Sequence, residues 1–182
     1  GQGGNSTILG SKGPKVHASF AALANGASSH AFEMDSVRVP STGIHPGASA
    51  VPPAMAVAEE IGSSGKDIIT AFVAGMEVMT RVGLATHHTS ETKGFHAPGL
   101  TGTIGSTAVA GNLLGLDENQ MANALGIAGS LCSGLMEFTK AGNGAMVKRL
   151  HIGRAAENGV VAANLAADGF EGPDTVLEGD FG

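Results

Sequence analysis

The stretch LTGTIGSTAVAGNLL, residues 100–114, decides how this sequence is expected to fold. Its small residues Gly102, Gly105, Ala108 and Gly111 recur at every third or fourth position, which places them on one face of a helix. Such a face lets another helix approach closely, because no long side chain stands between the two backbones. No strand is predicted ahead of these glycines, as a dinucleotide-binding loop requires, so we interpret them as helix-packing positions.

The composition of the whole chain supports packing by small residues. The 182 residues include 29 glycines and 7 phenylalanines but no tryptophan or tyrosine, and 42% of them are hydrophobic. The chain is therefore long and apolar enough to bury one domain core, and its helices are expected to lie close together. It starts at Gly1 rather than at a methionine, so we expect it to be an internal piece of a longer protein.

Further helices are predicted on both sides of this stretch. The apolar pattern favours helices over residues 18–35, 48–61, 66–86, 118–131 and 145–167. The first is expected to bend at Gly26, and the third to be well buried because its apolar residues occur at mixed three- and four-residue spacings. Pro52 and Pro53 are expected to be tolerated only in the first turn of the second helix. Asp117 is expected to cap the helix that starts at residue 118.

Glycine and proline mark the remaining segments as loops. Residues 1–17 are predicted to be extended and loop-rich, and residues 169–182 to form an exit punctuated by Gly and Pro. Loops are also predicted over residues 36–47, 87–98 and 132–144. No strand is convincingly predicted, so the expected fold class is all-α.

Charge and cysteine content exclude several partners and sites. The net charge is -6, and no basic run interleaved with aromatic residues points to nucleic acid or to an anionic membrane. The apolar stretches are interrupted well before the ~18 residues that a membrane-spanning helix needs. Cys132 is the single cysteine, which rules out an internal disulfide and a multi-cysteine zinc site. It also favours a reducing compartment, the cytoplasm or the mitochondrial matrix.

Polar side chains that could carry chemistry gather at predicted helix ends and loops. They form four groups: His30 with Glu33 and Asp35; His45; His87 and His88 with His96; and Lys148 with His151. In a chain with only 14% charged residues, this arrangement is expected of a polar pocket over a helical core. The basic residues near the start of the helix predicted over 145–167 oppose the helix dipole, so an acidic neighbour or a bound anion is expected there.

Acid–base chemistry suits these residues best. Histidine, carboxylate and lysine side chains can supply a base that removes a proton next to a carboxylate, an acid, and a cation that holds the substrate. A metal hydrolase is disfavoured, because the adjacent His87 and His88 cannot face one ion and no HExxH pattern occurs. The GSSG at residues 62–65 is better explained as a turn than as a serine nucleophile. Glu77 and Arg81 are interpreted as a structural ion pair.

Several motifs, taken together, resemble one family. They are ALANGASSHAFEMD, HPGASAVPPAMAVAEE, GMEVMTRVG, GFHAPGLTGTIGSTAVAGNLLGL, ALGIAGSLCSGL and VKRLHIGRAAENGVVAANLA. In this order they resemble the MmgE/PrpD family over nearly the whole chain. Its known members act on small di- and tricarboxylic acids by dehydration, decarboxylation or epimerisation.

The resemblance implies a fold and an activity. The fold is a helical, bundle-like main domain, often found as a homodimer, from which this chain lacks a smaller α/β lid domain. The activity is that of a cofactor-independent and metal-free lyase or isomerase, most of all a hydro-lyase of the 2-methylcitrate dehydratase type. Its partner is a small polycarboxylate substrate, with no nucleic acid and no membrane. The alternative is a non-catalytic helical scaffold that dimerises or binds carboxylates.

The resemblance also assigns site residues. The acidic motif D/E-x-D-D of the family falls on residues 33–36, its GFH motif on residues 94–96 and its K-x-LHxG motif on residues 148–153. It implies five catalytic residues, namely Glu33, Asp35, His45, His96 and Lys148. It further implies three residues that bind or support the substrate, namely Arg38, Arg149 and His151.

Roles for these residues follow from their chemistry and from two departures from the motifs. His96 and His45 are the expected acid and base, and Lys148 is expected to neutralise a substrate carboxylate as negative charge develops. Ser36 stands where the family has a second carboxylate. Arg38 lies in a loop that typically carries a histidine; an arginine there can bind a carboxylate but cannot perform acid–base work.

Overall fold

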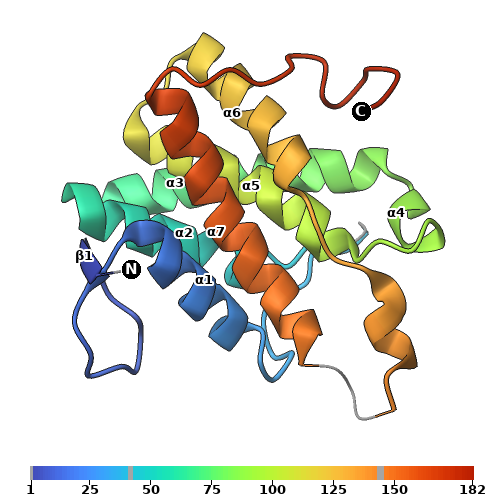
Figure 1. The fold of residues 1–182 in the computed structure, drawn as a ribbon, viewed down its shortest axis with the longest axis horizontal. Helices are drawn as coiled ribbons and strands as arrows, with labels where there is room; N and C mark the ends of the chain where they lie inside the picture. Colours follow the sequence, from blue (N-terminus) through green and yellow to red (C-terminus); the bar gives the residue numbers. More distant parts are fainter. Residues whose placement is uncertain (1, 41–42, 143–145) are drawn as a thin grey trace.

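The computed structural model describes residues 2–40, 43–142 and 146–182, and helices make up most of it (Figure 1). Its elements are β1 (Gln2–Ser6), α1 (Ala18–Ser29), α2 (Pro46–Ile61), α3 (Gly65–Ala85), α4 (Thr89–Thr92), α5 (Ala97–Leu114), α6 (Glu118–Leu131), the 3-10 helix η1 (Met136–Lys140) and α7 (Val147–Ala167). The predicted all-α class is confirmed. The strand β1 is a correction, because the sequence predicts no strand there; Ser6 at its end forms an antiparallel bridge with Val16.

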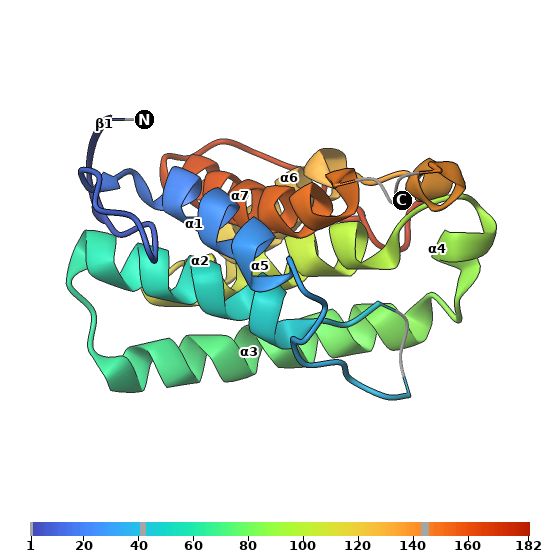
Figure 2. The ribbon, with the colours of Figure 1, turned by 90° about the horizontal axis from the view of Figure 1, so that it is seen from below.

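Helix α5 lies at the centre of the bundle. It packs against α2, α3, α6 and α7, and Figure 2 shows α3 as one outer layer with α1, α6 and α7 on the other side. A Cβ added to Gly105 would stand 3.1 Å from the carbonyl oxygen of Gly75 on α3. A Cβ added to Gly102 would stand 3.1 Å from side-chain atoms of both Ala155 and Ser49. The interpretation of these glycines as helix-packing positions is confirmed.

Helices α1 and α7 cross at a pair of glycines. A Cβ on Gly26 would lie 3.2 Å from the Cα of Gly153, and a Cβ on Gly153 would lie 2.5 Å from the carbonyl oxygen of Leu23. The predicted end of α1 near residue 35 is wrong. The helix stops at Ser29, and the backbone N–H of His30 closes it by donating to the Gly26 carbonyl at 3.3 Å.

Helix α2 carries its two prolines in its interior. It begins at Pro46 rather than at residue 48, so Pro52 and Pro53 lie beyond the first turn, contrary to prediction. Because Pro53 has no N–H, the carbonyl of Ser49 four residues earlier loses its helical partner. The hydroxyl of Ser106 on α5 donates to that carbonyl at 2.8 Å. The contact between α2 and α5 therefore replaces the hydrogen bond that the proline removes.

Helix α3 is less buried than the sequence predicts. Its buried residues are Ala71, Gly75, Met79, Thr80 and Gly83. On its other side Ile69 is 66% exposed and Val73 is 51% exposed. By length and composition alone, α3 is also the one helix in the described part of the chain that could cross a membrane, although the sequence predicts no stretch of that length. Its contacts with α2 and α5 make it a helix of this bundle.

The loops between helices are shorter than predicted. Helix α5 begins at Ala97 instead of residue 100, and the loop predicted over residues 87–98 contains α4. The loop predicted over residues 132–144 contains η1. Its last two residues, like residues 41 and 42, lie outside the described part of the chain. The start of the last helix, predicted at residue 145, is outside it too, and the described helix α7 begins at Val147.

Two local predictions are confirmed. Asp117 caps α6, since its carboxylate accepts the backbone N–H of Gln120 at 2.8 Å and the Gln120 side chain accepts the backbone N–H of Asp117 at 3.1 Å. Glu77 and Arg81 form an ion pair on α3 with 2.5 Å between Oε1 and Nη2. Both side chains of that pair are exposed, which fits a structural role on the surface.

Candidate functional site

Two histidines from different helices meet at the start of α5. His96 is the N-cap residue of α5, and its Nδ1 lies 3.1 Å from Nδ1 of His151 on α7. The backbone N–H of His96 donates to the Gly134 carbonyl at 3.0 Å. Phe138 of η1 packs edge-on against both imidazole rings. The segment that follows α6 thus holds the histidine pair in place from one side.

Burial keeps this histidine pair neutral. The pKa of His96 is lowered to about 3, first by burial and then by the positive charge that His151 carries when protonated, by Lys148, and by His30 and His45 when they are protonated. Burial also lowers the pKa of His151. At neutral pH one ring donates its Nδ1 proton to the Nδ1 lone pair of the other. His96 is therefore suited to hydrogen bonding with developing charge rather than to taking up a proton near pH 7.

A second cluster forms around the carboxylate of Asp35. Its Oδ1 lies 2.8 Å from Nδ1 of His30, and its Oδ2 lies 2.9 Å from Nδ1 of His45. Burial raises the pKa of Asp35, but the hydrogen bonds from His30 and His45, with the charge that either ring carries when protonated, together outweigh burial, so the pKa is lowered. Asp35 is therefore ionised and accepts a hydrogen bond from each imidazole.

Glu33 connects the segment after α1 to the start of α7. Its Oε1 lies 2.6 Å from Nζ of Lys148 and 3.4 Å from Nη2 of Arg149. The hydrogen bond from Lys148 lowers the pKa of Glu33, against the opposing effect of burial. Its backbone is left-handed, with φ 53°, a conformation that costs energy in a residue other than glycine. Glu33 is the acidic neighbour that the basic start of α7 was expected to need.

The two departures from the family motifs have different surroundings. The Ser36 hydroxyl accepts the backbone N–H of Gly47 at 2.9 Å, in the first turn of α2. His45 precedes that helix and makes no capping hydrogen bond with its side chain, so Ser36 takes over this task from the preceding loop. The guanidinium of Arg38 donates to the carbonyl of Val39, its own neighbour. Among the described residues, no hydrogen bond or ion pair joins the Arg38 side chain to either histidine cluster.

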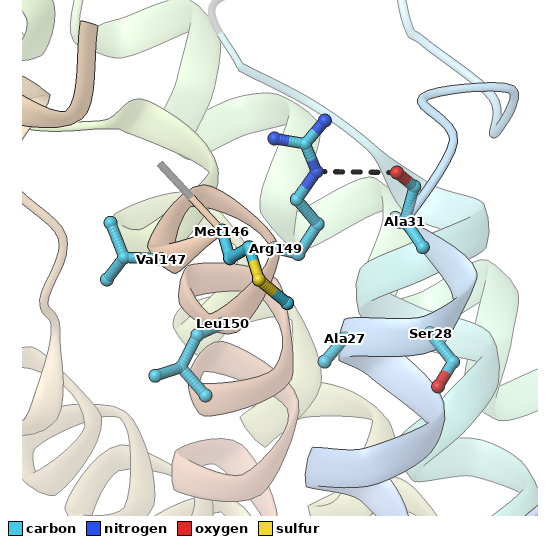
Figure 3. A pocket seen from close by; sticks show the side chains of 7 residues that line it. All are labelled: Ala27, Ser28, Ala31, Met146, Val147, Arg149 and Leu150. Carbon is cyan, nitrogen blue, oxygen red and sulfur yellow. Dashed lines mark hydrogen bonds between the residues drawn. The ribbon is translucent and has the colours of Figure 1, made fainter. Parts of the chain in front are cut away.

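A cavity of about 790 Å³ lies beside the Glu33 ion pair rather than over the histidines (Figure 3). It is lined by Ala27, Ser28, Ala31, Met146, Val147, Arg149 and Leu150. Figure 3 shows the one charged side chain of this lining, Arg149, whose Nε donates to the Ala31 carbonyl at 3.3 Å. Because the lining of the cavity is largely apolar and contains no histidine, we assign the acid–base chemistry to the two histidine clusters instead.

The cluster around Asp35 also bears on metal binding. Ligand atoms of His30, Asp35 and His45 lie within 4.8 Å of one another, and no other such group of three occurs in the described residues. The sequence argument against a metal rested on His87 and His88, on the absence of an HExxH pattern and on the single cysteine, and did not consider this cluster. The N···O distances of 2.8 and 2.9 Å are those of hydrogen bonds, in which Nδ1 carries a proton. In that state neither Nδ1 lone pair is available to a metal.

The structure brings most of the expected site residues together. His30 and His45 are near enough for their charges to lower the pKa of His96, and so is Lys148. Other histidines lie apart: His17 caps α1 by accepting the backbone N–H of Ser19, and His87 and His88 are exposed with left-handed backbones.

Sequence reasoning missed two contributors. His30 was grouped with Glu33 and Asp35 but given no role of its own in the site, and Phe138 was assigned no role.

The fold and the clusters define a class of protein: an all-α domain in which the ends of α1, α2, α5 and α7 present paired imidazoles, an ionised carboxylate and a lysine. The chain belongs to the MmgE/PrpD family, since the family model of the MmgE/PrpD N-terminal domain matches residues 1–182. The resemblance noted in its motifs is thereby confirmed.

Three curated proteins that are similar to this chain share the name cis-aconitate decarboxylase. Cis-aconitate decarboxylase of Homo sapiens is 35% identical over 98% of this chain and 37% of its own length. The protein of that name from Mus musculus is 33% identical over 96% of this chain and 36% of its own length. The one from Aspergillus terreus is 34% identical over 93% of this chain and 35% of its own length. The chain thus spans little more than a third of these relatives.

Proposed function

We propose that this chain supplies the helical side of the active site of a lyase that acts on a small di- or tricarboxylic acid. Decarboxylation of cis-aconitate or a close analogue is the leading reaction. One observation carries the proposal: three helix starts supply Lys148, the buried His96 and the Asp35-bound His45, and both Lys148 and His45 lie near enough to His96 to affect its pKa. The activity named for the relatives, at 33% to 35% identity, supports a carboxy-lyase.

In this proposal the basic start of α7 binds the substrate. Lys148 and Arg149 already hold one carboxylate, that of Glu33, at 2.6 and 3.4 Å. A substrate carboxylate presents the same oxygens and can share or replace that contact. A lysine beside a growing negative charge stabilises the transition state more than the ground state.

The proposed reaction balances with groups of this chain. The C–C bond to the departing carboxylate breaks, and its electron pair moves into the unsaturated system toward the remaining carboxylates. Lys148 and a ring N–H of the neutral histidine pair stabilise that charge. His45, held at Nδ1 by Asp35, takes up a proton from solvent at Nε2 and delivers it to carbon. A tricarboxylate and a proton thus become a dicarboxylate and carbon dioxide, with no change of oxidation state in the protein.

The 2-methylcitrate dehydratase-type hydro-lyase expected from the sequence is the second form of this proposal. There His45 accepts the proton next to a carboxylate and then delivers it to the departing hydroxyl, which leaves as water. Its support is the same Asp35–His45 pair, which can take up a proton as well as deliver one. The homodimer and the cytoplasmic or mitochondrial-matrix location also remain proposals that rest on the family.

The test is conversion of defined acids by the full-length protein. It is incubated with a chelator and, separately, with cis-aconitate, 2-methylcitrate, citrate and iminodisuccinate, and products are followed by proton NMR. We expect loss of carbon dioxide from cis-aconitate. Loss of water from 2-methylcitrate or citrate would instead make the protein a hydro-lyase. Saturable binding without any turnover would favour the non-catalytic scaffold.

Substitutions of two lysines, one in the proposed site and one outside it, provide a matched comparison for this test. Lys148→Met is expected to lower turnover about 100-fold or more, the scale of losing one preorganised electrostatic contact. Lys140→Met, at an exposed position on η1, should leave turnover unchanged. Equal turnover in the two variants would remove Lys148 from the site.

A further inference from the structure

We infer that His30 is a positioning residue of this site: from the buried end of α1 it holds one oxygen of Asp35, so that the other oxygen fixes His45 with its Nε2 free for proton transfer. His30 is not among the residues to which a catalytic or substrate-binding role is given above. Its catalytic consequence rests on the proposed function, whereas the hydrogen-bond arrangement does not. The two are tested separately below.

The imidazoles of His30 and His45 differ in burial, and this difference suits them to different tasks. The side chain of His30 is 0% exposed, that of Asp35 is 7% exposed and that of His45 is 19% exposed. A group that exchanges protons with a substrate needs access to it, and within this cluster the ring of His45 has the most. His30 is enclosed, so its ring can hold Asp35 but cannot reach a substrate.

The hydrogen bonds fix the proton positions on both rings. An ionised Asp35 only accepts, so Nδ1 of each histidine must donate. The Nε2 atom of His30 is buried and has no hydrogen-bond partner among the residues that the structure describes. A proton on that atom would be an unsatisfied donor on a buried cation, which costs more than an unused lone pair on a neutral ring. His30 is therefore a neutral Nδ1–H donor.

The local fold explains why His30 can hold this position. It closes α1 with its backbone N–H, and the chain then turns so that Asp35, five residues later, returns to its ring. The ring also packs edge-on against His45, with 4.8 Å between centroids. With one donor on each oxygen, the Asp35 carboxylate cannot rotate without losing a hydrogen bond. A carboxylate held in this way sets the tautomer and direction of its histidine, as in hydrolase triads.

Two variants separate the hydrogen bond from the bulk of the ring. His30→Asn places an amide N–H near the position of Nδ1 and should retain the contact with Asp35. His30→Leu keeps a similar apolar volume and removes the donor. The tautomers are read from long-range proton–nitrogen NMR of the ring nitrogens in protein labelled with 15N-histidine.

The expected NMR result is specific. In the unsubstituted protein and in His30→Asn, His45 carries its proton on Nδ1; in His30→Leu it becomes a mixture of tautomers. Where a substrate is turned over, His30→Leu lowers kcat about tenfold or more at constant KM, and His30→Asn restores most of it. An unchanged His45 tautomer in folded His30→Leu would overturn the inference.

The unsubstituted protein alone provides a second test, in case His30→Leu does not fold. A protonated His30, or a His30 with its proton on Nε2, would also overturn the inference. Absence of turnover with every acid, together with the expected tautomers, would reject the proposed function and leave the role of His30 standing.

Discussion

The two histidine clusters of this domain differ in what faces each imidazole. His30 and His45 share the ionised carboxylate of Asp35, at 2.8 and 2.9 Å. His96 faces only another imidazole, that of His151, at 3.1 Å, and its pKa is lowered to about 3. One cluster therefore supplies a counter-charge for an imidazolium, whereas the other excludes it.

This difference shows how one residue type, histidine, can perform two tasks in a single site. Asp35 holds Nδ1 of His45, so Nε2 is the atom of that ring that can exchange a proton with a substrate. Burial beside other cations keeps His96 neutral, so it can donate a hydrogen bond to negative charge without carrying a charge itself. Each prediction below tests one part of this contrast.

The largest expected effect is on proton transfer at the carboxylate cluster. His45→Gln keeps a polar side chain but removes the acid–base group. Turnover by the full-length protein should fall about 10²–10⁴-fold, the usual contribution of general acid–base catalysis. Steady-state rates with the acid that is converted measure the effect.

The matched control is His87→Gln, an exposed histidine in another loop. It should turn over like the unsubstituted protein. If His45→Gln retained most of the activity, the carboxylate cluster would be structural, and the contrast between the two clusters would lose its functional meaning.

The second-largest expected effect concerns the neutral pair of His96 and His151, which should make the free energy of unfolding depend on pH. Unfolded His96 takes up a proton below about pH 6.5, but in the folded protein its pKa is lowered to about 3. Protons therefore favour the unfolded state as the pH falls from about 6.5 toward 3. The free energy of unfolding should drop by up to about 1.4 kcal/mol per pH unit from this group.

Urea unfolding between pH 6.5 and 5 measures this slope while Asp35 and Glu33, whose pKa values are lowered, remain ionised. His96→Asn should show a shallower decline than the unsubstituted protein. His87→Asn should leave the slope as it is. Parallel slopes in all three proteins would mean that His96 is not kept neutral by the fold.

The helices of this domain could largely be predicted from the sequence, because small residues at helical spacing specify both a helix and a face that packs closely. The burial of α3 could not. Periodicity shows that Ile69 and Val73 lie on an apolar helix, but it does not show whether another element covers them. The prolines of α2 were placed wrongly for a related reason, since the hydroxyl that compensates Pro53 belongs to Ser106 on another helix.

Within the site, the sequence identified side chains better than their states. Glu33, Asp35 and Lys148 were expected from motifs, and the structure gives each a hydrogen-bonded partner. The pKa of His96 could not be predicted, because it depends on burial and on residues from three other segments. His30 was underestimated because the end of α1 is set by tertiary contacts rather than by helix propensity.

A smaller effect is expected where the helices that carry the two clusters cross. Gly153→Ala would place a Cβ 2.5 Å from the carbonyl oxygen of Leu23 on α1. Because backbone must move, we expect a loss of about 1–3 kcal/mol in the free energy of unfolding, the usual cost of overpacking. Gly65→Ala meets nothing within 4 Å and is the control. Equal stability of the two variants in urea would show that α1 and α7 can separate without cost.

The smallest effect concerns the loop between Asp35 and His45. Ser36→Ala removes the hydroxyl that accepts the Gly47 N–H at 2.9 Å in the first turn of α2. The loss should be about 1 kcal/mol, as for other helix caps. Ser36→Asp should keep or increase stability, because a carboxylate accepts the same N–H and favours a helix N-terminus. The stability of Ser36→Ala and Ser36→Asp is compared by thermal unfolding. If Ser36→Asp were the less stable variant, the added charge would be acting on Asp35, and the carboxylate cluster would be sensitive to its loop as well as to His30.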